Sequence, residues 1–266
     1  MKKRILTALV LLIILIPVLM VGGILFNLAV LAIGIIAIKE MLDIRDGNNQ
    51  LPITMKLIGC ISFVYLVSSF SGGSDFTYLL DYRIIAFISL ILLLPIVIYH
   101  DKDVYNINDA LYMLGLIFFL GLSFNLIITI RSASLMTLIY LLIITIVTDA
   151  YALFGGLLIG KRKLLESISP NKTWGGLIIG TIFGVLIASI FYYIAINDGI
   201  NITYLIICTT LLSLIGQFGD LVFSSIKRLY GKKDFSNLLP GHGGILDRFD
   251  SFIFVALGYV FLMFIL

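Results

Sequence analysis

Charged residues are scarce in this chain. Only 12% of its 266 residues are Asp, Glu, Lys or Arg, while 61% are hydrophobic. Soluble domains carry about 25% charged residues. With a mean hydropathy of +1.14, the chain lacks the polar side chains that would cover a soluble domain of this length. The composition excludes an ordinary soluble protein and predicts an all-α, polytopic integral membrane protein in which helices pack on helices in lipid.

Cysteine and histidine are also scarce, with two residues of each. Cys60 and Cys208 lie in apolar stretches without Cys-x-x-Cys or Cys/His spacing, which indicates neither a disulfide framework nor a structural zinc site. We interpret both as small packing residues. No hydrophilic domain, low-complexity segment or internal repeat is present. Residues 1–266 are therefore predicted to form a single transmembrane domain.

Nine apolar stretches are near the length of about 17 to 25 residues that a helix needs to cross a bilayer. They cover residues 5–21, 23–38, 57–74, 84–99, 110–130, 134–159, 175–196, 202–223 and 250–266. The second stretch is short and follows Gly22-Gly23, so it forms either its own crossing or a re-entrant hairpin with the first. The sequence predicts eight or nine crossings, and the distribution of charge favours about nine.

Positive charge is concentrated on one side of this predicted bundle. When nine spans alternate from a cytoplasmic N-terminus, 16 of the 18 Lys and Arg residues lie in cytoplasmic segments, and only Arg83 and Arg131 lie outside. This distribution satisfies the positive-inside rule. We therefore expect a cytoplasmic N-terminus. The two most basic loops, which follow the sixth and eighth stretches, should face the cytoplasm together.

One acidic residue interrupts the sixth apolar stretch. A carboxylate such as that of Asp149 costs about 2.5 to 3.5 kcal/mol in the hydrocarbon. On a helix, Asp149 shares a face with Gly156 and Gly160, small residues that allow another helix or a ligand to approach closely. Asp149 is therefore either a functional acid or a group whose hydrogen bond holds two helices together.

Further carboxylates lie near the ends of the last two stretches. Asp220 shares a helix face with Ser224 and Lys227, four and seven positions later. Asp247 and Asp250 are three positions apart and point the same way if the last helix begins there. Mg²⁺ binds through one or two carboxylates, waters and substrate phosphates. The three acids are therefore candidates for a magnesium site.

Two loops have the composition of phosphate-binding sites. Residues 240–244, Pro-Gly-His-Gly-Gly, lead into a helix whose free N–H groups and positive dipole end suit an anion. Residues 169–174, Ser-Pro-Asn-Lys-Thr-Trp, place hydroxyls and a lysine before another helix. A solvated cytoplasmic loop would explain the lysines around the first loop, but neither its acids nor its glycines. In the second loop, Ser, Asn and Thr are also common helix-capping residues. Trp174 could equally serve as an anchor at the membrane–water interface.

At these positions the sequence resembles the phosphatidate cytidylyltransferase family. The family's C-terminal signature joins a Ser and a Lys-Arg pair to a Lys-Asp element, a Pro-x-His-Gly-Gly turn and a final Asp-Arg-x-Asp. All its fixed positions are met, by Ser224, Ile226, Lys227, Arg228, Lys233, Asp234, Ser236, Leu239, Pro240, His242, Gly243, Gly244, Ile245, Asp247, Arg248, Phe249 and Asp250. Gly219-Asp220, residues 169–174 and the spacing from Asp149 to Lys161 match as well. Leu153 and Gly175 depart from the family's usual aromatic and polar residues.

The resemblance implies an activity and a set of roles. The family makes CDP-diacylglycerol and diphosphate from CTP and phosphatidic acid with Mg²⁺, and it allows a second cation. The implied metal ligands are Asp220 and Asp247, with Asp250 as a further ligand or support. The implied catalytic residues are Asp220, Asp247, Lys227, Arg228 and Asp250. The implied substrate-binding residues are Ser169, Lys172, Thr173, Ser224, Lys233, His242, Gly243, Gly244, Arg248 and Asp149.

The expected partners are CTP, phosphatidic acid and membrane lipids, with no nucleic acid, and the family suggests a homodimer. We expect a multi-pass protein of the bacterial cytoplasmic membrane with its active site on the cytoplasmic side. Residues 1–133 would hold the N-terminal spans, and residues 134–266 the catalytic spans and loops.

Two other functions are compatible with some of these features. A CTP-dependent polyprenol or phytol kinase would transfer the γ-phosphoryl group to an alcohol instead. A membrane transporter would also use an intramembrane acid and glycine-rich helices. The lack of inverted repeats and the one-sided polar cluster count against a transporter.

Overall fold

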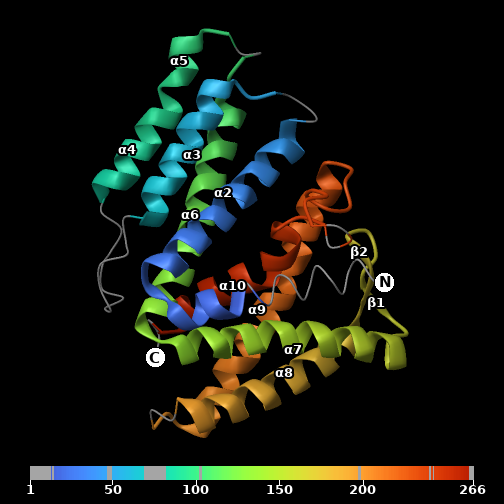
Figure 1. The fold of residues 1–266 in the computed structure, drawn as a ribbon. Helices are drawn as coiled ribbons and strands as arrows, with labels where there is room; N and C mark the ends of the chain where they lie inside the picture. Colours follow the sequence, from blue (N-terminus) through green and yellow to red (C-terminus); the bar gives the residue numbers. More distant parts are fainter. Residues whose placement is uncertain are drawn as a thin grey trace. The chain divides into compact units, whose positions relative to one another are not determined.

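The computed structural model describes residues 13, 15–46, 50–68, 82–101, 104–196, 199–239, 241 and 243–263. Nearly all of its elements are helices (Figure 1). They are α2 (Gly23–Asp46), α3 (Ile53–Ser68), α4 (Tyr82–Leu93), α5 (Pro95–Tyr99), α6 (Ile107–Ala133), α7 (Leu135–Ile159), α8 (Trp174–Ala195), α9 (Ile202–Leu229) and α10 (Leu246–Met263). Two short strands, β1 (Lys163–Leu165) and β2 (Ser169–Thr173), lie between α7 and α8.

Six helical segments among the described residues are long and apolar enough to cross a membrane. They are α2, α4 with α5, α6, α7, α8 and α9. Helix α3 is apolar but has only 16 residues. The structure confirms the prediction of an all-α, polytopic membrane protein. The total of nine crossings and their orientation stay predictions, since most of the first stretch, 5–21, lies outside the described residues.

Several helices extend beyond the apolar stretches that predicted them. Helix α2 continues from residue 38 to Asp46, and α9 continues from residue 223 to Leu229. The added turns contain Lys39, Glu40 and Lys227, residue types that favour helix as well as most apolar residues do. Polar side chains are thereby placed on rigid helix ends.

The chain divides into two compact units. The first comprises residues 1–133 and 234–246, and the second comprises residues 134–233 and 247–266. The assignment of the N-terminal spans to residues 1–133 and of the catalytic spans to residues 134–266 stays a prediction. The segment 234–246, however, belongs to the first unit although its neighbours in sequence belong to the second.

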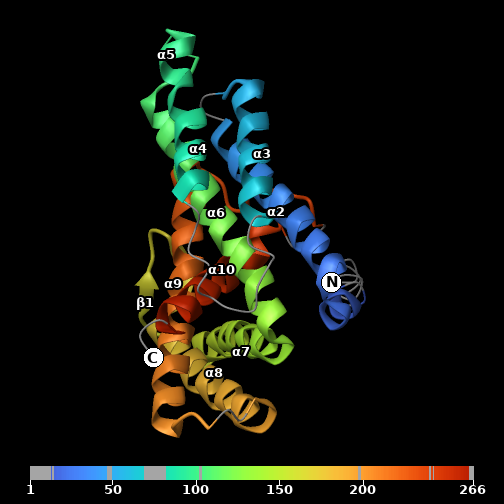
Figure 2. The ribbon, with the colours of Figure 1, turned by 90° about the vertical axis from the view of Figure 1, so that its left-hand side faces the viewer.

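Helices α2, α3, α4 and α6 pack side by side in the first unit (Figures 1 and 2). Their core includes Phe63 and Phe124, whose rings meet edge to face with centroids 6.0 Å apart. A buried ion pair joins Arg45 of α2 to Asp109 of α6. Tyr112 of α6 also donates its hydroxyl hydrogen bond to the Met41 carbonyl at 2.7 Å. These contacts fix the end of α2 against α6.

Helices α7 and α8 lie against each other along their lengths in the second unit (Figure 1). Small residues make this contact. A Cβ on Gly180 would lie 2.7 Å from the Thr148 carbonyl oxygen, and one on Gly176 would lie 2.5 Å from that of Ala152. On α9, a Cβ on Gly219 would lie 2.6 Å from the Phe254 Cβ of α10. The glycines therefore allow the close helix packing typical of membrane bundles.

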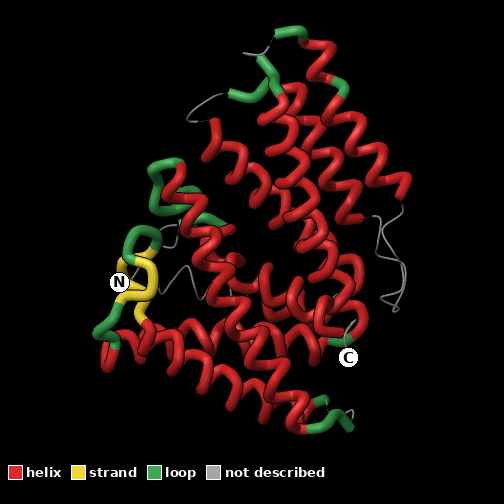
Figure 3. The backbone as a smooth tube through the Cα atoms, turned by 180° about the vertical axis from the view of Figure 1, so that it is seen from behind, coloured by secondary structure: helices red, strands yellow, loops and turns green. Residues whose placement is uncertain are grey.

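The connection between α7 and α8 is an antiparallel hairpin, shown in yellow in Figure 3. Lys163 pairs with Thr173, and Leu165 pairs with Ser169. We expected only a loop here, because three- and five-residue strands leave no alternating pattern long enough to recognise.

Candidate active site

Six charged side chains form a candidate site in the second unit, and we call them the ionic cluster. They come from helix α7, strand β2, the end of α9 and the start of α10. They are Asp149, Lys172, Asp220, Lys227, Asp247 and Asp250. All six are site residues that we predicted from the sequence, and the fold brings them together.

The first ion pair of the cluster joins Lys172 to Asp220. The Lys172 Nζ lies 2.6 Å from the Asp220 Oδ2 and donates a second hydrogen bond to the Gln217 carbonyl at 3.1 Å. Ser224 donates its hydroxyl hydrogen bond to the Asp220 Oδ1 at 3.3 Å, so these two side chains meet on one face of α9, as predicted. About a quarter of each charged side chain is accessible, 26% for Lys172 and 27% for Asp220. This pair is therefore open to a ligand.

The second ion pair joins Lys227 to Asp247, with 2.6 Å between Nζ and Oδ1. Both side chains are buried, with accessible fractions of 9% for Lys227 and 4% for Asp247. Asp250, three positions further along α10, is also buried, and its Oδ1 accepts the Ser251 N–H at 2.8 Å. The end of α9 is thus tied to the start of α10 by a charged contact.

The ionic cluster carries more negative than positive charge. Asp149, Asp220 and Asp250 are close enough for their charges to repel, while Lys172 attracts Asp149 and Lys227 attracts Asp250. With its groups ionised, four carboxylates face two ammonium groups, a formal excess of two negative charges. A bound divalent cation would offset this excess.

The donor chemistry of the cluster fits Mg²⁺. Its acids offer hard oxygen ligands, which Mg²⁺ prefers. The described residues contain no group of three or more His, Cys, Asp or Glu side chains placed to hold a metal ion. Mg²⁺ does not need such a protein cage, because waters and substrate phosphates complete its coordination. Asp220, Asp247 and Asp250 stay the predicted ligands.

Strand pairing and a helix cap position Lys172. Its neighbour Thr173 ends β2 in an extended conformation, and the Thr173 hydroxyl accepts the Gly176 N–H at 3.1 Å, which caps α8. Thr173 is only 5% exposed. A Cβ on Gly160 would lie 2.8 Å from its methyl carbon. Thr173 therefore caps α8, and Gly160 leaves room for the start of that helix; a substrate-binding role of Thr173 stays a prediction.

Four other predicted residues lie around the hairpin and the helix ends. The Arg228 guanidinium donates hydrogen bonds to the Ile168 carbonyl at 3.3 Å and the Lys232 carbonyl at 2.9 Å. It thereby joins the hairpin turn to the segment after α9. Ser169 begins β2 and is half-buried, whereas Lys233 and Arg248 are exposed.

The predicted glycine-rich turn belongs to the first unit. The Gly243 carbonyl accepts the Leu239 N–H at 2.9 Å, and Gly243 has a φ of +81°, a conformation that glycine adopts without strain. Pro240 and His242 lie outside the described residues. The backbone after Gly244 is bound by Glu40 of α2, a residue that we did not predict from the sequence. Its only signal was an acid at the end of an apolar stretch.

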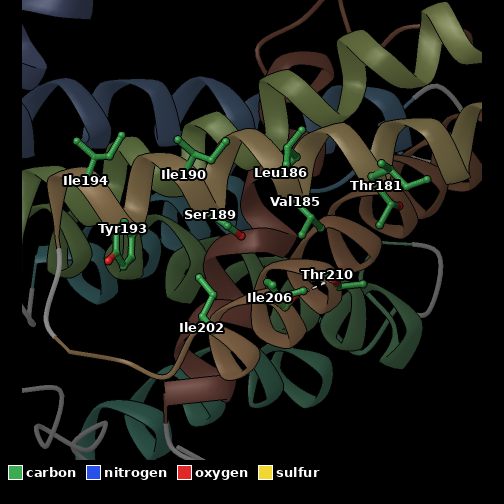
Figure 4. A pocket seen from close by; sticks show the side chains of 11 residues that line it. Thr181, Val185, Leu186, Ser189, Ile190, Tyr193, Ile194, Ile202, Ile206 and Thr210 are labelled. Carbon is green, nitrogen blue, oxygen red and sulfur yellow. Dashed lines mark hydrogen bonds between the residues drawn. The ribbon is translucent and has the colours of Figure 1, made fainter.

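An apolar groove of about 650 Å³ runs between helices α8 and α9 in the second unit (Figure 4). Its lining residues are Thr181, Ile182, Val185, Leu186, Ser189, Ile190, Tyr193, Ile194, Ile202, Ile206 and Thr210. None of these lining residues is charged, whereas the ionic cluster is formed by charged side chains alone. The Thr181 hydroxyl accepts a hydrogen bond from Gln217 at 2.9 Å, and the Gln217 carbonyl accepts one from Lys172. One hydrogen-bonded chain therefore connects groove and cluster.

The whole chain was compared with known proteins by sequence. Residues 2–266 match the model of the cytidylyltransferase family. The chain is 35% identical over 255 residues to the phosphatidate cytidylyltransferase of Staphylococcus haemolyticus. It is 36% identical over 256 residues to that of Staphylococcus saprophyticus and 34% identical over 255 residues to that of Staphylococcus aureus. Each alignment covers 96% of this chain and 96% of the relative.

Proposed function

This chain belongs to the cytidylyltransferase family, and from that membership we propose that it makes CDP-diacylglycerol and diphosphate from CTP and phosphatidic acid. An oxygen of the phosphatidate phosphate attacks the α-phosphorus of CTP and forms the new P–O bond. The bond from the α-phosphorus to the oxygen that bridges to the β-phosphate breaks, and diphosphate leaves. The lipid phosphate is itself the nucleophile, so the protein supplies position and charge rather than a covalent intermediate.

The observation that carries this proposal is the ionic cluster. Two polyanions must approach each other, and the developing negative charge must be neutralised in place. Lys172 and Lys227 are each held beside a carboxylate, 2.6 Å away. The accessible Lys172 ammonium can transfer its hydrogen bond to a phosphate oxygen, and the buried Lys227 adds positive charge beside it. Mg²⁺, if bound by Asp220 and Asp247 with Asp250 as a further ligand or support and with waters and phosphates completing its shell, would supply further positive charge to the reacting phosphates.

The surroundings of the cluster suit a lipid substrate. Phosphatidic acid has a charged head and acyl chains that stay in hydrocarbon. The ionic cluster combines Asp149 and Asp220 of membrane-spanning helices with Lys172 of the hairpin, and Gln217 links it to the apolar groove. The groove offers an apolar surface to an acyl chain. The positive-inside distribution supports a cytoplasmic active site in the bacterial cytoplasmic membrane. The homodimer stays a prediction.

One assay tests the reaction and separates it from the alternatives. Purified full-length protein is given phosphatidic acid, Mg²⁺ and CTP labelled at either the α- or the γ-phosphate. We expect the α-label in CDP-lipid and the γ-label in diphosphate. Chelation with EDTA should abolish turnover, and added Mg²⁺ should restore it. A γ-labelled lipid with a polyprenol or phytol would indicate the kinase instead. The absence of nucleotide turnover with every lipid would refute the enzyme assignment.

A further inference from the structure

We propose that Glu40 is a positioning residue for this reaction: its buried carboxylate binds the Ser236 hydroxyl and the backbone N–H groups of Ile245 and Leu246, directly before Asp247. The proposal rests on the proposed function, because that function assigns the turn to substrate and Asp247 to the metal. It gives the first unit a role in the reaction, whereas the sequence left the role of these spans open.

Three hydrogen bonds of the first unit carry the inference. The Glu40 Oε1 accepts the Ser236 hydroxyl at 2.6 Å and the Ile245 N–H at 2.9 Å. Its Oε2 accepts the Leu246 N–H at 2.9 Å. Glu40 is only 4% exposed. Both carboxylate oxygens therefore bind a segment about 200 positions away in sequence, and a buried acid is stable there because its oxygens are satisfied.

The Glu40 carboxylate occupies the space that a side chain at position 244 would fill. A Cβ on Gly244 would lie 2.5 Å from the Glu40 Oε1 and 2.7 Å from its Cδ. We predicted that Gly244 brings bare backbone close to a phosphate. In the structure its bare backbone admits an acid from α2, so one glycine of the signature has a steric role within the protein.

The contact also fixes where helix α10 begins. Leu246 is the first residue of α10, and Asp247 and Asp250 are the second and fifth. The first N–H groups of a helix have no partner within it, and here Glu40 accepts that of Leu246. Since Asp247 follows Leu246 directly in the chain, a shift of the Leu246 backbone moves Asp247. Displacements near 1 Å at reacting groups cost on the order of 100-fold in rate.

Glu40 can hold this segment because its own helix is fixed. On the same end of α2, Arg45 forms the buried pair with Asp109, and the Met41 carbonyl accepts the Tyr112 hydroxyl. Asp43, three positions after Glu40, is exposed. Asp43 therefore provides a matched control, an acid on the same helix that is open to solvent.

The test compares Glu40→Gln with Asp43→Asn in reconstituted full-length protein. Gln keeps the size of Glu but replaces one acceptor oxygen with a donor, which then opposes a backbone N–H. We expect Glu40→Gln to lower kcat about 10- to 100-fold. The Mg²⁺ concentration for half-maximal rate should rise several-fold. The thermal unfolding midpoint should fall, because a buried backbone N–H loses its acceptor, so kcat is measured per folded molecule. Asp43→Asn should match the wild type in all three measurements.

The outcomes separate this inference from the proposed function. If wild-type protein forms no CDP-lipid, the proposed function fails. If wild-type protein is active and Glu40→Gln has the kcat and Mg²⁺ dependence of Asp43→Asn, the positioning role alone is refuted. If Glu40→Gln does not fold, Glu40→Asp is used as the test variant. It keeps the negative charge, but its side chain is shorter, so the carboxylate lies farther from Ser236, Ile245 and Leu246. Positioning requires a lower kcat per folded molecule and a raised Mg²⁺ requirement, and normal values of both would overturn the inference.

Discussion

The two ion pairs of the candidate active site use the same chemical groups in different surroundings. Lys172 and Asp220 each keep about a quarter of the side chain accessible, whereas Lys227 and Asp247 are almost fully enclosed. Exposed pairs contribute roughly 0 to 1 kcal/mol to stability because water and salt screen them. Removing one partner of a buried pair leaves an uncompensated charge and costs about 3 to 5 kcal/mol. The accessible pair is thus suited to exchange partners with substrate, and the buried pair also holds helices together.

The substitution Asp247→Asn should have the largest effect. It removes a predicted metal ligand and leaves the Lys227 ammonium buried without its carboxylate. We expect turnover to fall on the order of 100- to 1,000-fold and stability to fall by about 3 kcal/mol. CDP-lipid formation and thermal unfolding in detergent measure the two effects.

Its control is the double variant Asp247→Asn with Lys227→Met, which removes the stranded charge. The double variant should recover much of the lost stability but no turnover. Near-normal turnover of Asp247→Asn would exclude a metal-ligand role. Unchanged stability would remove the difference between the two pairs.

The substitution Asp220→Asn should reduce turnover by a similar factor, on the order of 100- to 1,000-fold. Its stability, however, should change by less than about 1 kcal/mol, because Lys172 can be solvated once its partner is neutral. The same two measurements apply, with membrane insertion as a check on expression. A stability loss as large as that of Asp247→Asn would show that accessibility does not separate the two pairs.

The smallest effect is expected for Ser224→Ala. The Ser224 hydroxyl lies 3.3 Å from the Asp220 Oδ1, so it orients the accessible pair without being one of its charges. Losing one such hydrogen bond corresponds to about 1 kcal/mol, or roughly a 5-fold lower kcat. Initial rates at saturating CTP test this. Ser225→Ala on the next, exposed position serves as the control. Equal rates for both variants would count against an orienting role.

The sequence predicts those parts of the site that depend on local spacing. Asp220 and Ser224 are four positions apart on one helix, and their side chains meet as the helical period requires. Composition and apolar length likewise suffice to predict a helical membrane protein. The signature residues around α9 and α10 carry the resemblance to a family, and the cations and carboxylates among them are residue types that phosphate transfer requires.

Other parts of the site depend on contacts that no local pattern records. The strands of the hairpin that carries Lys172 have only three and five residues, too few to show an alternation of apolar and polar residues in the sequence. The pairing of Lys227 with Asp247 depends on how the chain returns after α9. Glu40 reaches Ile245 and Leu246 across about 200 residues, and an acid at the end of an apolar stretch has no visible partner in sequence.

Exchange of halves between related enzymes should be limited by the binding of Glu40 to Ser236, Ile245 and Leu246. A hybrid joined after residue 133 would take Glu40 from one parent and segment 234–246 from the other. The stability and activity of the hybrid would depend on whether both parents have an acid at position 40, a small hydroxyl residue at position 236 and a glycine at position 244. Residues 40, 236 and 244 should therefore be inherited as one set, although they are far apart in the gene.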